Sequence, residues 1–340
     1  MISRINPTGK VVMVGAPSIN TMLDAGEAEL KKRGHAVVRY ANAAEFNAAE
    51  ANRASSLLAD GDVLVAMGMP CTRALLSSAK LRAVVSPYTG TEFIDVAAAT
   101  ELGIVVGFGQ TPENTIGMAE STILFILATF YDLQRSEKLL RDNAARVPRF
   151  ARLLRGKTVG LIGLGAVGRA IIDRLAGWET KILVTTPRPR AVPPGVEVVA
   201  LDELLAVSDV VVVVAALNAE TQGLLNAERL ARMKKDAILV NTARGGIIDE
   251  AALVAAMKRG HLASVALDVF ETEPLPADSP LRDLPNAVLT PHRVGQTIES
   301  DLTLTPAAVE NMVRPMEGRA PLLVRNPEVL PVWEARWRIP

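Results

Sequence analysis

Short apolar runs alternate with amphipathic segments along the whole chain. In the first half, strand-like runs lie at 10–16, 35–40, 62–67 and 81–87 (KVVMVGA, HAVVRY, DVLVAM and LRAVVSP). The amphipathic stretch TMLDAGEAELKKRG separates the first two runs. Strands that alternate with helical segments pair in parallel, because a crossover helix brings each strand back in the same direction. The pattern therefore predicts a small open α/β unit.

A second α/β series follows a long apolar segment. The stretch STILFILATFYDLQRSEKLLRDN (121–143) is apolar early and charged late, and it predicts one long helix that runs between two domains. The later runs are bounded, rich in β-branched residues and apolar on both faces, as buried parallel strands are. These candidate strands are 157–163, 181–186, 209–217, 237–243, 264–270 and 287–292.

The C-terminal part predicts a return to the first domain. PAAVENMVRPMEG (306–318) has a helical pattern after the last predicted strand, and we expect it to pack on the first unit. The predicted domains are 1–120 with 298–340, and 121–297. The final segment carries Trp333 and Trp337 and could dock a partner or form an arm within a dimer.

Composition narrows the class of protein. The 340 residues carry 37 Lys and Arg against 37 Asp and Glu, so nothing suggests a nucleic-acid binder. A hydrophobic fraction of 49% with 22% charged residues predicts a well-filled core. One cysteine and three histidines make a metal site unexpected and a reducing, cytoplasmic compartment expected. No targeting segment and no apolar run long enough for a membrane helix is expected.

A glycine loop follows the predicted strand at 157–163. In TVGLIGLGAVGR the glycines are Gly163, Gly165 and Gly168, directly before a helix-like segment. In a βαβ unit the first glycine allows a tight turn, the second lets the backbone approach a pyrophosphate, and the third allows close packing of helix on strand. The strand and helix around the loop favour a dinucleotide site over a glycine-rich turn without a ligand.

The end of the next predicted strand indicates which dinucleotide. An NAD site places an acidic residue about twenty residues after the first glycine, where it binds the ribose hydroxyls. This chain has Thr186 there, followed by Arg188 and Arg190 in VTTPRPR. A 2′-phosphate pairs with arginine, so the stretch favours NADP(H), with NAD(H) still possible. The alternative is a pair of solvated arginines on a proline-rich turn.

Three charged residues follow later predicted strands: Arg244 in VNTARGGIIDE, Glu273 in LDVFETEPLP and His292 in LTPHRVGQT. Parallel sheets bind ligands at the carboxyl ends of their strands, so these side chains could share one crevice. A guanidinium can hold a carboxylate at two points, and a histidine can exchange a hydroxyl proton near neutral pH. A carboxylate beside the histidine would orient the ring and favour its charged form.

These residues and motifs resemble the D-isomer-specific 2-hydroxyacid dehydrogenase family. The resemblance is carried by KTVGLIGLGAVGRAI, ILVNTARGGIIDEAAL, ALDVFETEPLP and LTPHRVGQTIES, with a weaker PENTIGMAES, over about residues 81–318. It implies two doubly wound parallel-sheet domains, a flavodoxin-like substrate domain and a Rossmann dinucleotide-binding domain, with the active site in the cleft between them. It also implies a homodimer.

The resemblance implies roles for individual residues. Arg244 would bind the substrate carboxylate, His292 would be the general acid/base, and Glu273 would be its partner. Asp268 would lie beside the nicotinamide carboxamide. Further expected cofactor contacts are Ala166 and Val167 at the pyrophosphate, and Thr242, Ala243 and Gly295 at the nicotinamide.

The chain departs from the family at the substrate loop and after the histidine. The loop SPYTGTEFID keeps Gly90 but has Tyr88 where the family often has a first glycine, and Tyr88, Thr89 and Gly90 are the expected substrate contacts. Tyr88 would narrow the pocket or bind substrate, or be a surface residue. Arg293 could bind a second acidic group or reach solvent.

The sequence favours an NADP(H)-preferring 2-oxo acid reductase and leaves two alternatives. The same residues could serve a dehydrogenase of a non-carboxylate oxyanion such as phosphite. A dinucleotide-sensing interaction protein, similar to transcriptional corepressors of this fold, would bind the cofactor with little turnover.

Overall fold

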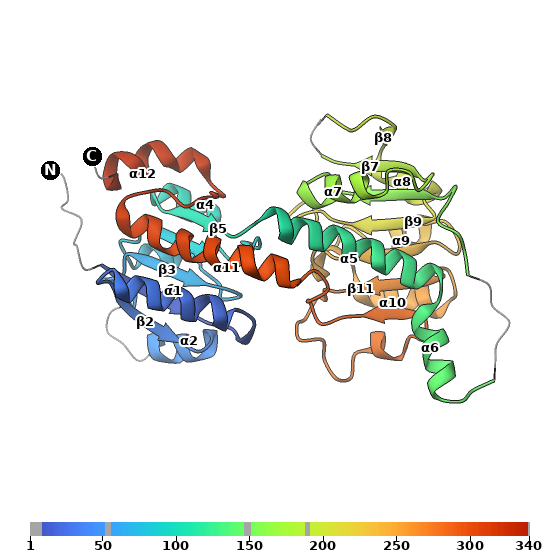
Figure 1. Ribbon diagram of the computed structural model, residues 1–340, viewed down its shortest axis with the longest axis horizontal. Coiled ribbons are helices and arrows are strands. Elements are labelled where there is room, and N and C mark those ends of the chain that lie inside the picture. The colour runs from blue at the N-terminus through green and yellow to red at the C-terminus, as the bar shows by residue number, and fades with distance from the viewer. Residues whose placement is uncertain (1–8, 52–55, 146–150, 188–190, 339–340) are drawn as a thin grey trace. The chain divides into compact units, whose positions relative to one another are not determined.

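The computed structural model describes residues 9–51, 56–145, 151–187 and 191–338 (Figure 1). The chain divides into two compact units. Unit 1 consists of Met1–Asn114 and Ile298–Pro340, and unit 2 of Thr115–Thr297. Each unit has its own sheet and its own core.

Unit 1 is built on a five-stranded parallel sheet in the order β2-β1-β3-β4-β5. This is the flavodoxin-like order, in which the chain winds outward from β1 in both directions. All residues of β3 and β4 are buried, as expected for strands covered on both faces. The strands are β1 (Lys10–Val14), β2 (Ala36–Tyr40), β3 (Val63–Ala66), β4 (Ala83–Ser86) and β5 (Val105–Phe108).

Helices cover both faces of this sheet. One face packs on a core cluster that includes Leu23 and Met312, and the other on a cluster that includes Phe46 and Leu76. Figure 1 shows α1 and α11 side by side over the sheet. The helices are α1 (Asn20–Lys32), α2 (Ala43–Ala51), α3 (Arg73–Ser77), α4 (Val96–Glu101), α11 (Ile298–Val313) and α12 (Leu330–Trp337).

Unit 2 has a seven-stranded parallel sheet in the order β12-β11-β10-β9-β6-β7-β8. Counted from its first strand, β6, this is the Rossmann order with one further strand at the β12 edge. The carboxyl ends of all seven strands therefore lie along one edge. The strands are β6 (Thr158–Ile162), β7 (Lys181–Thr185), β8 (Val196–Val198), β9 (Val210–Val213), β10 (Ile238–Asn241), β11 (Ser264–Leu267) and β12 (Ala287–Leu289).

Two buried clusters lie on opposite faces of this second sheet. One joins Ile126 of α5 with Ile171 of α7, and the other joins Leu204, Leu230 and Met257 from three later helices. The helices are α5 (Pro112–Phe130), α6 (Leu133–Arg141), α7 (Ala166–Arg174), α8 (Leu201–Val207), α9 (Ala227–Arg232) and α10 (Glu250–Lys258). The prediction of two doubly wound parallel-sheet folds is confirmed.

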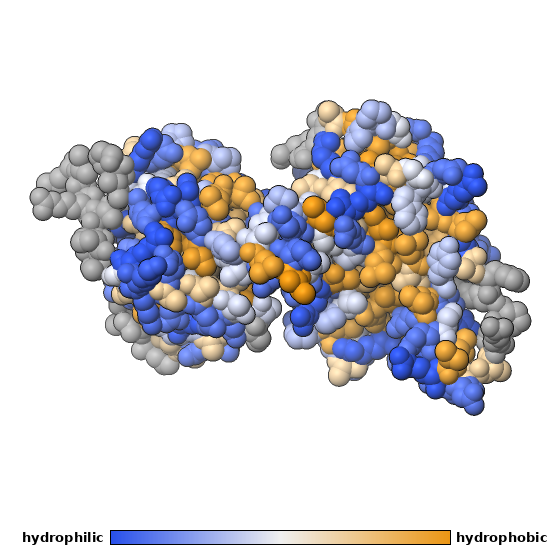
Figure 2. Space-filling view, in the orientation of Figure 1, coloured by the Kyte–Doolittle hydropathy of each residue, from blue (hydrophilic) through white to orange (hydrophobic). Residues whose placement is uncertain are grey.

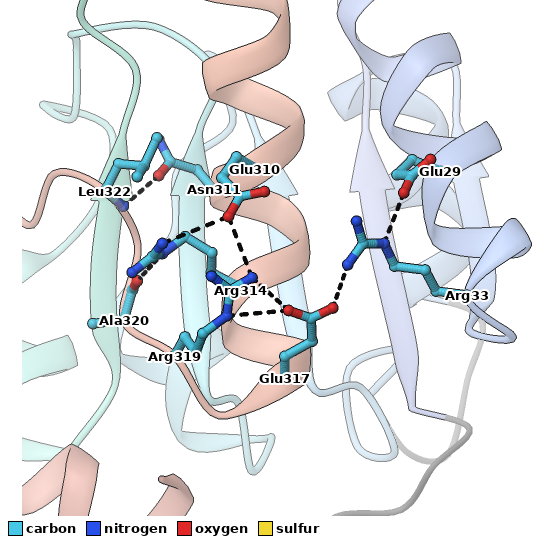
Figure 3. Close-up of polar contacts among 9 residues, drawn as sticks. All are labelled: Glu29, Arg33, Glu310, Asn311, Arg314, Glu317, Arg319, Ala320 and Leu322. Carbon is cyan, nitrogen blue, oxygen red and sulfur yellow. Dashed lines mark hydrogen bonds and ion pairs between the residues drawn. The ribbon is translucent and has the colours of Figure 1, made fainter. Parts of the chain in front are cut away.

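Polar contacts fix the returning C-terminal segment on unit 1 (Figure 3). Arg33, at the end of α1, pairs with Glu317, which also binds Arg319 at 2.5 Å. Asn311 of α11 accepts a hydrogen bond from the Leu322 amide at 2.7 Å and donates one to the Phe108 carbonyl at 3.0 Å. The segment is therefore part of unit 1.

The C-terminal tryptophans are core residues of unit 1. Trp333 is fully buried, and its Nε1–H donates to the Arg82 carbonyl at 2.7 Å. Trp337 is 8% exposed, and the Arg82 guanidinium lies 4.8 Å from its ring centroid. The expectation of a partner-docking or dimer arm is wrong for these two side chains, because the chain buries them in its own core.

Three further element predictions need correction. The single helix predicted at 121–143 is two helices, α5 and α6, bent by 60°. The bend is at Asp132, which has a left-handed conformation with φ 49° and cannot continue a right-handed helix. The short strands β5 and β8 have no counterpart among the predicted runs, and α11 begins at Ile298 rather than near 306.

No single helix within the described ranges is long and apolar enough to cross a membrane. Only α5 and α6 taken together, across their bend, reach the required length and hydropathy.

Candidate active site

The loop between β6 and α7 has the geometry that its glycine spacing predicts. Gly163 has φ 108°, and a Cβ there would lie 2.9 Å from the backbone of Ala215. A Cβ on Gly168 would lie 2.9 Å from the Gly163 carbonyl oxygen. Both positions therefore need glycine, the first for backbone conformation and the second for close packing of α7 on β6.

Gly165 lies in a different environment. It is the N-cap of α7, is exposed, and has no heavy atom within 4 Å of an added Cβ. Its glycine is therefore not required by the packing of unit 2. The open space lies at the positive N-terminal end of α7, with the backbone amides of Ala166 and Val167 in the first turn. This loop fits a dinucleotide pyrophosphate.

Thr186 follows β7 directly, beside the strand that carries the glycine loop. Arg188 and Arg190 lie outside the described residues. Among the described residues, Arg169 of α7 donates to the Ala191 carbonyl at 2.8 Å. Positive side chains thus follow the strand end where an NAD site carries an acid.

Arg244 follows β10, and a buried amide positions it. Asn241, 1% exposed, donates to the Arg244 carbonyl at 2.9 Å and accepts from the Ala243 amide at 3.0 Å. The Arg244 guanidinium donates to the Ala243 carbonyl at 2.7 Å. A Cβ on Gly245 would lie 1.8 Å from the Phe270 carbonyl carbon, so this loop packs directly on the loop after β11.

His292 and Glu273 form a direct pair. The His292 Nδ1 lies 2.6 Å from Glu273 Oε2, and the other Glu273 oxygen accepts from the Phe270 amide at 3.0 Å. Burial raises the pKa of Glu273. The His292 hydrogen bond and charge, the Phe270 amide and the Arg244 charge together lower it by more, so the pKa of Glu273 is below its ordinary value. An ionised Glu273 holds the imidazole by Nδ1, which leaves Nε2 for another group.

Asp268 braces the turn that carries His292. Its carboxylate is buried and accepts from Thr290 Oγ1 at 2.5 Å, the Arg293 amide at 2.9 Å and the Val294 amide at 3.2 Å. The Asp268 carbonyl accepts from the His292 amide at 2.8 Å. Burial raises the pKa of Asp268, and the three hydrogen bonds oppose that shift in part. His292 itself has φ 55°, an uncommon conformation that these bonds hold in place.

Two of the residues expected near the nicotinamide, Thr242 and Gly295, contact α5. Thr242 Oγ1 lies 2.9 Å from Thr122 Oγ1 in the interior of unit 2. A Cβ on Gly295 would lie 2.0 Å from the sulfur of Met118, so any larger residue there would require this flexible side chain to shift. The contact of Asp268, Thr242, Ala243 and Gly295 with a cofactor stays a prediction.

The expected substrate loop follows β4 in unit 1. Tyr88 is half-buried and packs against the unit 1 core, which argues against a purely surface role. Thr89 Oγ1 donates to the Gly109 carbonyl at 3.0 Å, and the Gly90 carbonyl accepts from Ser86 Oγ at 2.7 Å. Arg293 is exposed, and its Nε donates to Gln296 at 3.2 Å.

Two residues of the site were not anticipated from the sequence, Asn241 and Thr290. Both are short polar residues at the end of an apolar strand, which is the signal that could have singled them out. Each uses a side chain to brace the loop that carries a charged residue, Arg244 or His292.

The site thus places an arginine, a histidine–glutamate pair and an open glycine loop at the start of a helix along the carboxyl edge of one Rossmann sheet. A family model described as the D-isomer specific 2-hydroxyacid dehydrogenase, NAD binding domain, matches residues 123–293. The match spans half of the chain and includes Arg244, Glu273 and His292. The chain belongs to the D-isomer-specific 2-hydroxyacid dehydrogenase family, as the resemblance indicated.

Individual relatives agree with this class. The chain is 40% identical to a glyoxylate reductase of Thermofilum pendens over 260 residues, 73% of this chain and 76% of the relative. It is 40% identical to a D-3-phosphoglycerate dehydrogenase of Archaeoglobus fulgidus over 246 residues, 71% of this chain and 46% of the relative. The chain therefore spans about half the length of that relative.

A solved structure of a glyoxylate reductase from Paecilomyes thermophila is 26% identical, with a TM-score of 0.80, and covers 95% of this chain and 100% of that one. The protein is a nicotinamide-dependent oxidoreductase of the class that acts on the CH–OH group of 2-hydroxy acids.

Proposed function

We propose that the chain is an NADP(H)-preferring D-2-hydroxyacid dehydrogenase that works as a reductase of a small 2-oxo acid. The observation that carries the proposal is the 2.6 Å pair between His292 and Glu273, with Arg244 on the loop packed beside it. A histidine held by one ring nitrogen is suited to move a proton at the other. The name of the Thermofilum pendens relative makes glyoxylate the first substrate to test.

In this proposal each charged residue has one task. Arg244 binds the substrate carboxylate at two points and polarises the neighbouring carbonyl. His292 donates a proton from Nε2 to the carbonyl oxygen, while Glu273 keeps the ring oriented and stabilises its charged form. Tyr88, Thr89 and Gly90 form the substrate loop.

The cofactor belongs on the glycine loop. Gly165 and the first amides of α7, at Ala166 and Val167, would hold the pyrophosphate. Thr186, Arg188 and Arg190 would favour the 2′-phosphate. When bound, the dinucleotide supplies the hydride that reduces the carbonyl carbon.

The decisive experiment is nicotinamide absorbance during turnover. NADPH and NADH are offered separately with glyoxylate, hydroxypyruvate and bulky aromatic 2-oxo acids. We expect NADPH to be consumed well ahead of NADH, and H292Q to lower kcat/KM by about 10²–10⁴-fold. Dinucleotide binding without turnover on any 2-oxo acid would overturn the proposal in favour of a sensor, and turnover of phosphite alone in favour of an oxyanion dehydrogenase.

The cofactor preference has its own test. Replacing Arg188 and Arg190 with alanine removes up to two charge-assisted contacts, so the KM for NADPH should rise about 10-fold or more. The KM for NADH should change less than about twofold, because NADH has no 2′-phosphate. Equal effects on the KM values of both cofactors would indicate that the two arginines do not bind the 2′-phosphate and are solvated residues of a turn.

We also propose a cytoplasmic homodimer, formed through the apolar surface of α5 and α6. Figure 2 shows hydrophobic side chains gathered over α5. Leu124 is 54% exposed, and Leu133 and Leu140 of α6 are 58% and 84% exposed. Sedimentation should give twice the chain mass of 36.2 kDa, and L124E with L140E should give the monomer. A monomeric wild-type protein at micromolar concentration would contradict this.

A further inference from the structure

Two glutamates outside the histidine–glutamate pair, Glu250 and Glu271, are joined by hydrogen bonds. The carboxylate of each accepts a hydrogen bond from the backbone amide of the other. The Glu250 amide donates to Glu271 Oε1 at 3.1 Å, and the Glu271 amide donates to Glu250 Oε1 at 2.5 Å. Glu250 is the first residue of α10, and Glu271 lies two residues before Glu273. We call this reciprocal pair of hydrogen bonds the Glu250–Glu271 clamp.

The clamp gives hydrogen-bond partners to two backbone amides, those of Glu250 and Glu271. The first amides of a helix have no partner within the helix, and an anion is favoured at that end. Glu271 supplies this anion to α10, while the Asp249 side chain caps the Ala252 amide at 2.8 Å. The loop that carries Glu273 is thereby joined to α10.

A second contact fixes the same loop from the other side. Gly245 leaves no room for a side chain against the backbone of Phe270 and Glu271. The Phe270 amide in turn donates to Glu273 at 3.0 Å. The backbone from Phe270 to Glu273 is therefore held between the Arg244 loop and the start of α10, and the Glu273 carboxylate takes its position from that backbone.

The clamp also places charge beside the pair. Burial raises the pKa of Glu250, and the nearby charges of Glu271 and Glu273 raise it further, against the hydrogen bond from the Glu271 amide. The charged groups named in this region are Glu250 and Asp249 at the start of α10, Asp268 and Glu271 after β11, Arg244 after β10, and Arg293 after β12. Among them Glu250 joins α10 to the loop after β11 through a hydrogen bond from the Glu271 amide.

We propose that Glu250 is a positioning residue for the acid–base pair, acting through Glu271 and the loop after β11 to hold Glu273 in its place against His292. The inference rests on the proposed function for its kinetic part. It does not rest on it for its structural part, because the contact between His292 and Glu273 can be followed by NMR without turnover.

The test compares E250Q with E250A. The glutamine keeps an oxygen that accepts from the Glu271 amide but loses the charge, whereas the alanine loses both. In E250A we expect kcat to fall about 3- to 10-fold, a part of the 10²–10⁴-fold that general acid–base catalysis contributes, with KM within about twofold. E250Q should recover most of kcat.

The position of Glu273 has a separate readout in the NMR signals of the His292 ring, which Glu273 contacts at 2.6 Å. The chain has only three histidines, so NMR can follow His292 directly, with H292Q to assign its signal. The His292 signals should move in E250A and stay close to their wild-type positions in E250Q, because the glutamine keeps the oxygen that accepts from the Glu271 amide.

E228Q is the matched control. Glu228 lies in the first turn of α9 in the same unit and pairs with Arg232 at 2.8 Å on the surface. E228Q should change neither the His292 ring signals nor kcat. Unchanged His292 ring signals in E250A, with the variant folded by circular dichroism, overturn the inference. Changed signals in E250A, together with a wild-type protein that reduces no 2-oxo acid, would overturn the proposed function and leave the clamp standing.

Discussion

The position of Arg244 depends on neighbouring residues as well as on its own side chain. Its backbone is fixed by the buried side chain of Asn241, and its loop packs on the loop that leads to Glu273. The position suits a planar two-point donor rather than a general positive charge. That difference can be measured.

We predict that R244K keeps the fold and the dinucleotide affinity but raises the KM for 2-oxo acids about 10- to 100-fold. Lysine retains the charge but loses the two-point geometry that binds a carboxylate. Steady-state kinetics and cofactor fluorescence titration give the two readouts. Arg232 on the surface of α9 is the control, and R232K should leave both unchanged. An unchanged KM in R244K would remove the arginine from the substrate site.

Glu273 makes stability depend on pH in a defined direction. Its folded-state pKa is below the ordinary value, so the ionised form stabilises the fold above pH about 4.3, the unfolded-state pKa of Glu. The contribution is lost as pH falls through the lower folded-state pKa. We expect E273Q to lower Tm at pH 7 and to lose this effect at pH 3, by calorimetry at both values. A Tm difference that is the same at both pH values would contradict the assignment.

At the scale of elements, the two adjacent glycines after β10 differ in how tightly the surrounding atoms pack against them. A Cβ on Gly245 would overlap the backbone of Phe270, whereas one on Gly246 would meet only the flexible Gln222 amide at 3.1 Å. We predict that G245A lowers the free energy of unfolding by about 3 kcal/mol or more and that G246A lowers it by less than about 1 kcal/mol. Urea unfolding measures both, and equal losses would show that the two loops do not pack as described.

At the start of α7, Gly165 is a glycine that the packing of the fold does not require. A Cβ on Gly165 meets no heavy atom within 4 Å, and its backbone at φ −84° and ψ −165° is open to alanine. G165A should therefore change the free energy of unfolding by less than about 1 kcal/mol. If the open space takes a pyrophosphate, the Kd for either dinucleotide should rise about 10-fold or more. Unchanged affinity by fluorescence titration would remove the loop from the cofactor site.

At the scale of the whole molecule, the two units have separate cores. Trp333 lies in the core of unit 1 with no exposed surface, although it is close to the C-terminus in sequence. The glycine loop, Arg244 and His292 all belong to unit 2. Damage to one core should therefore be visible apart from the other.

We predict that W333A destabilises unit 1 by about 3–5 kcal/mol and splits thermal unfolding into two steps. Dinucleotide binding by unit 2 should persist past the first step. W178A is the control, because Trp178 is 39% exposed in unit 2 and should leave one transition. A single transition in W333A, with binding lost at the same temperature, would show that the units unfold together.

Most of the elements and the chemistry of the site could be predicted from the sequence. Buried strands, the glycine spacing and the order Arg244, Glu273, His292 are local signals, because each depends on neighbouring residues and on the period of the backbone. The break at Asp132 was missed, since a left-handed residue inside an apolar helical pattern leaves the period of that pattern intact.

The sequence by itself determined the class of fold, the family and the candidate residues of the site. Only the tertiary structure decided which of them meet. Glu273 and His292 are brought together because β11 and β12 are neighbours in the sheet, and Trp333 is buried because the C-terminal segment returns to the first sheet. Such contacts depend on strand order and on packing between residues far apart in the sequence. A local pattern of residues does not determine the energies of these long-range contacts.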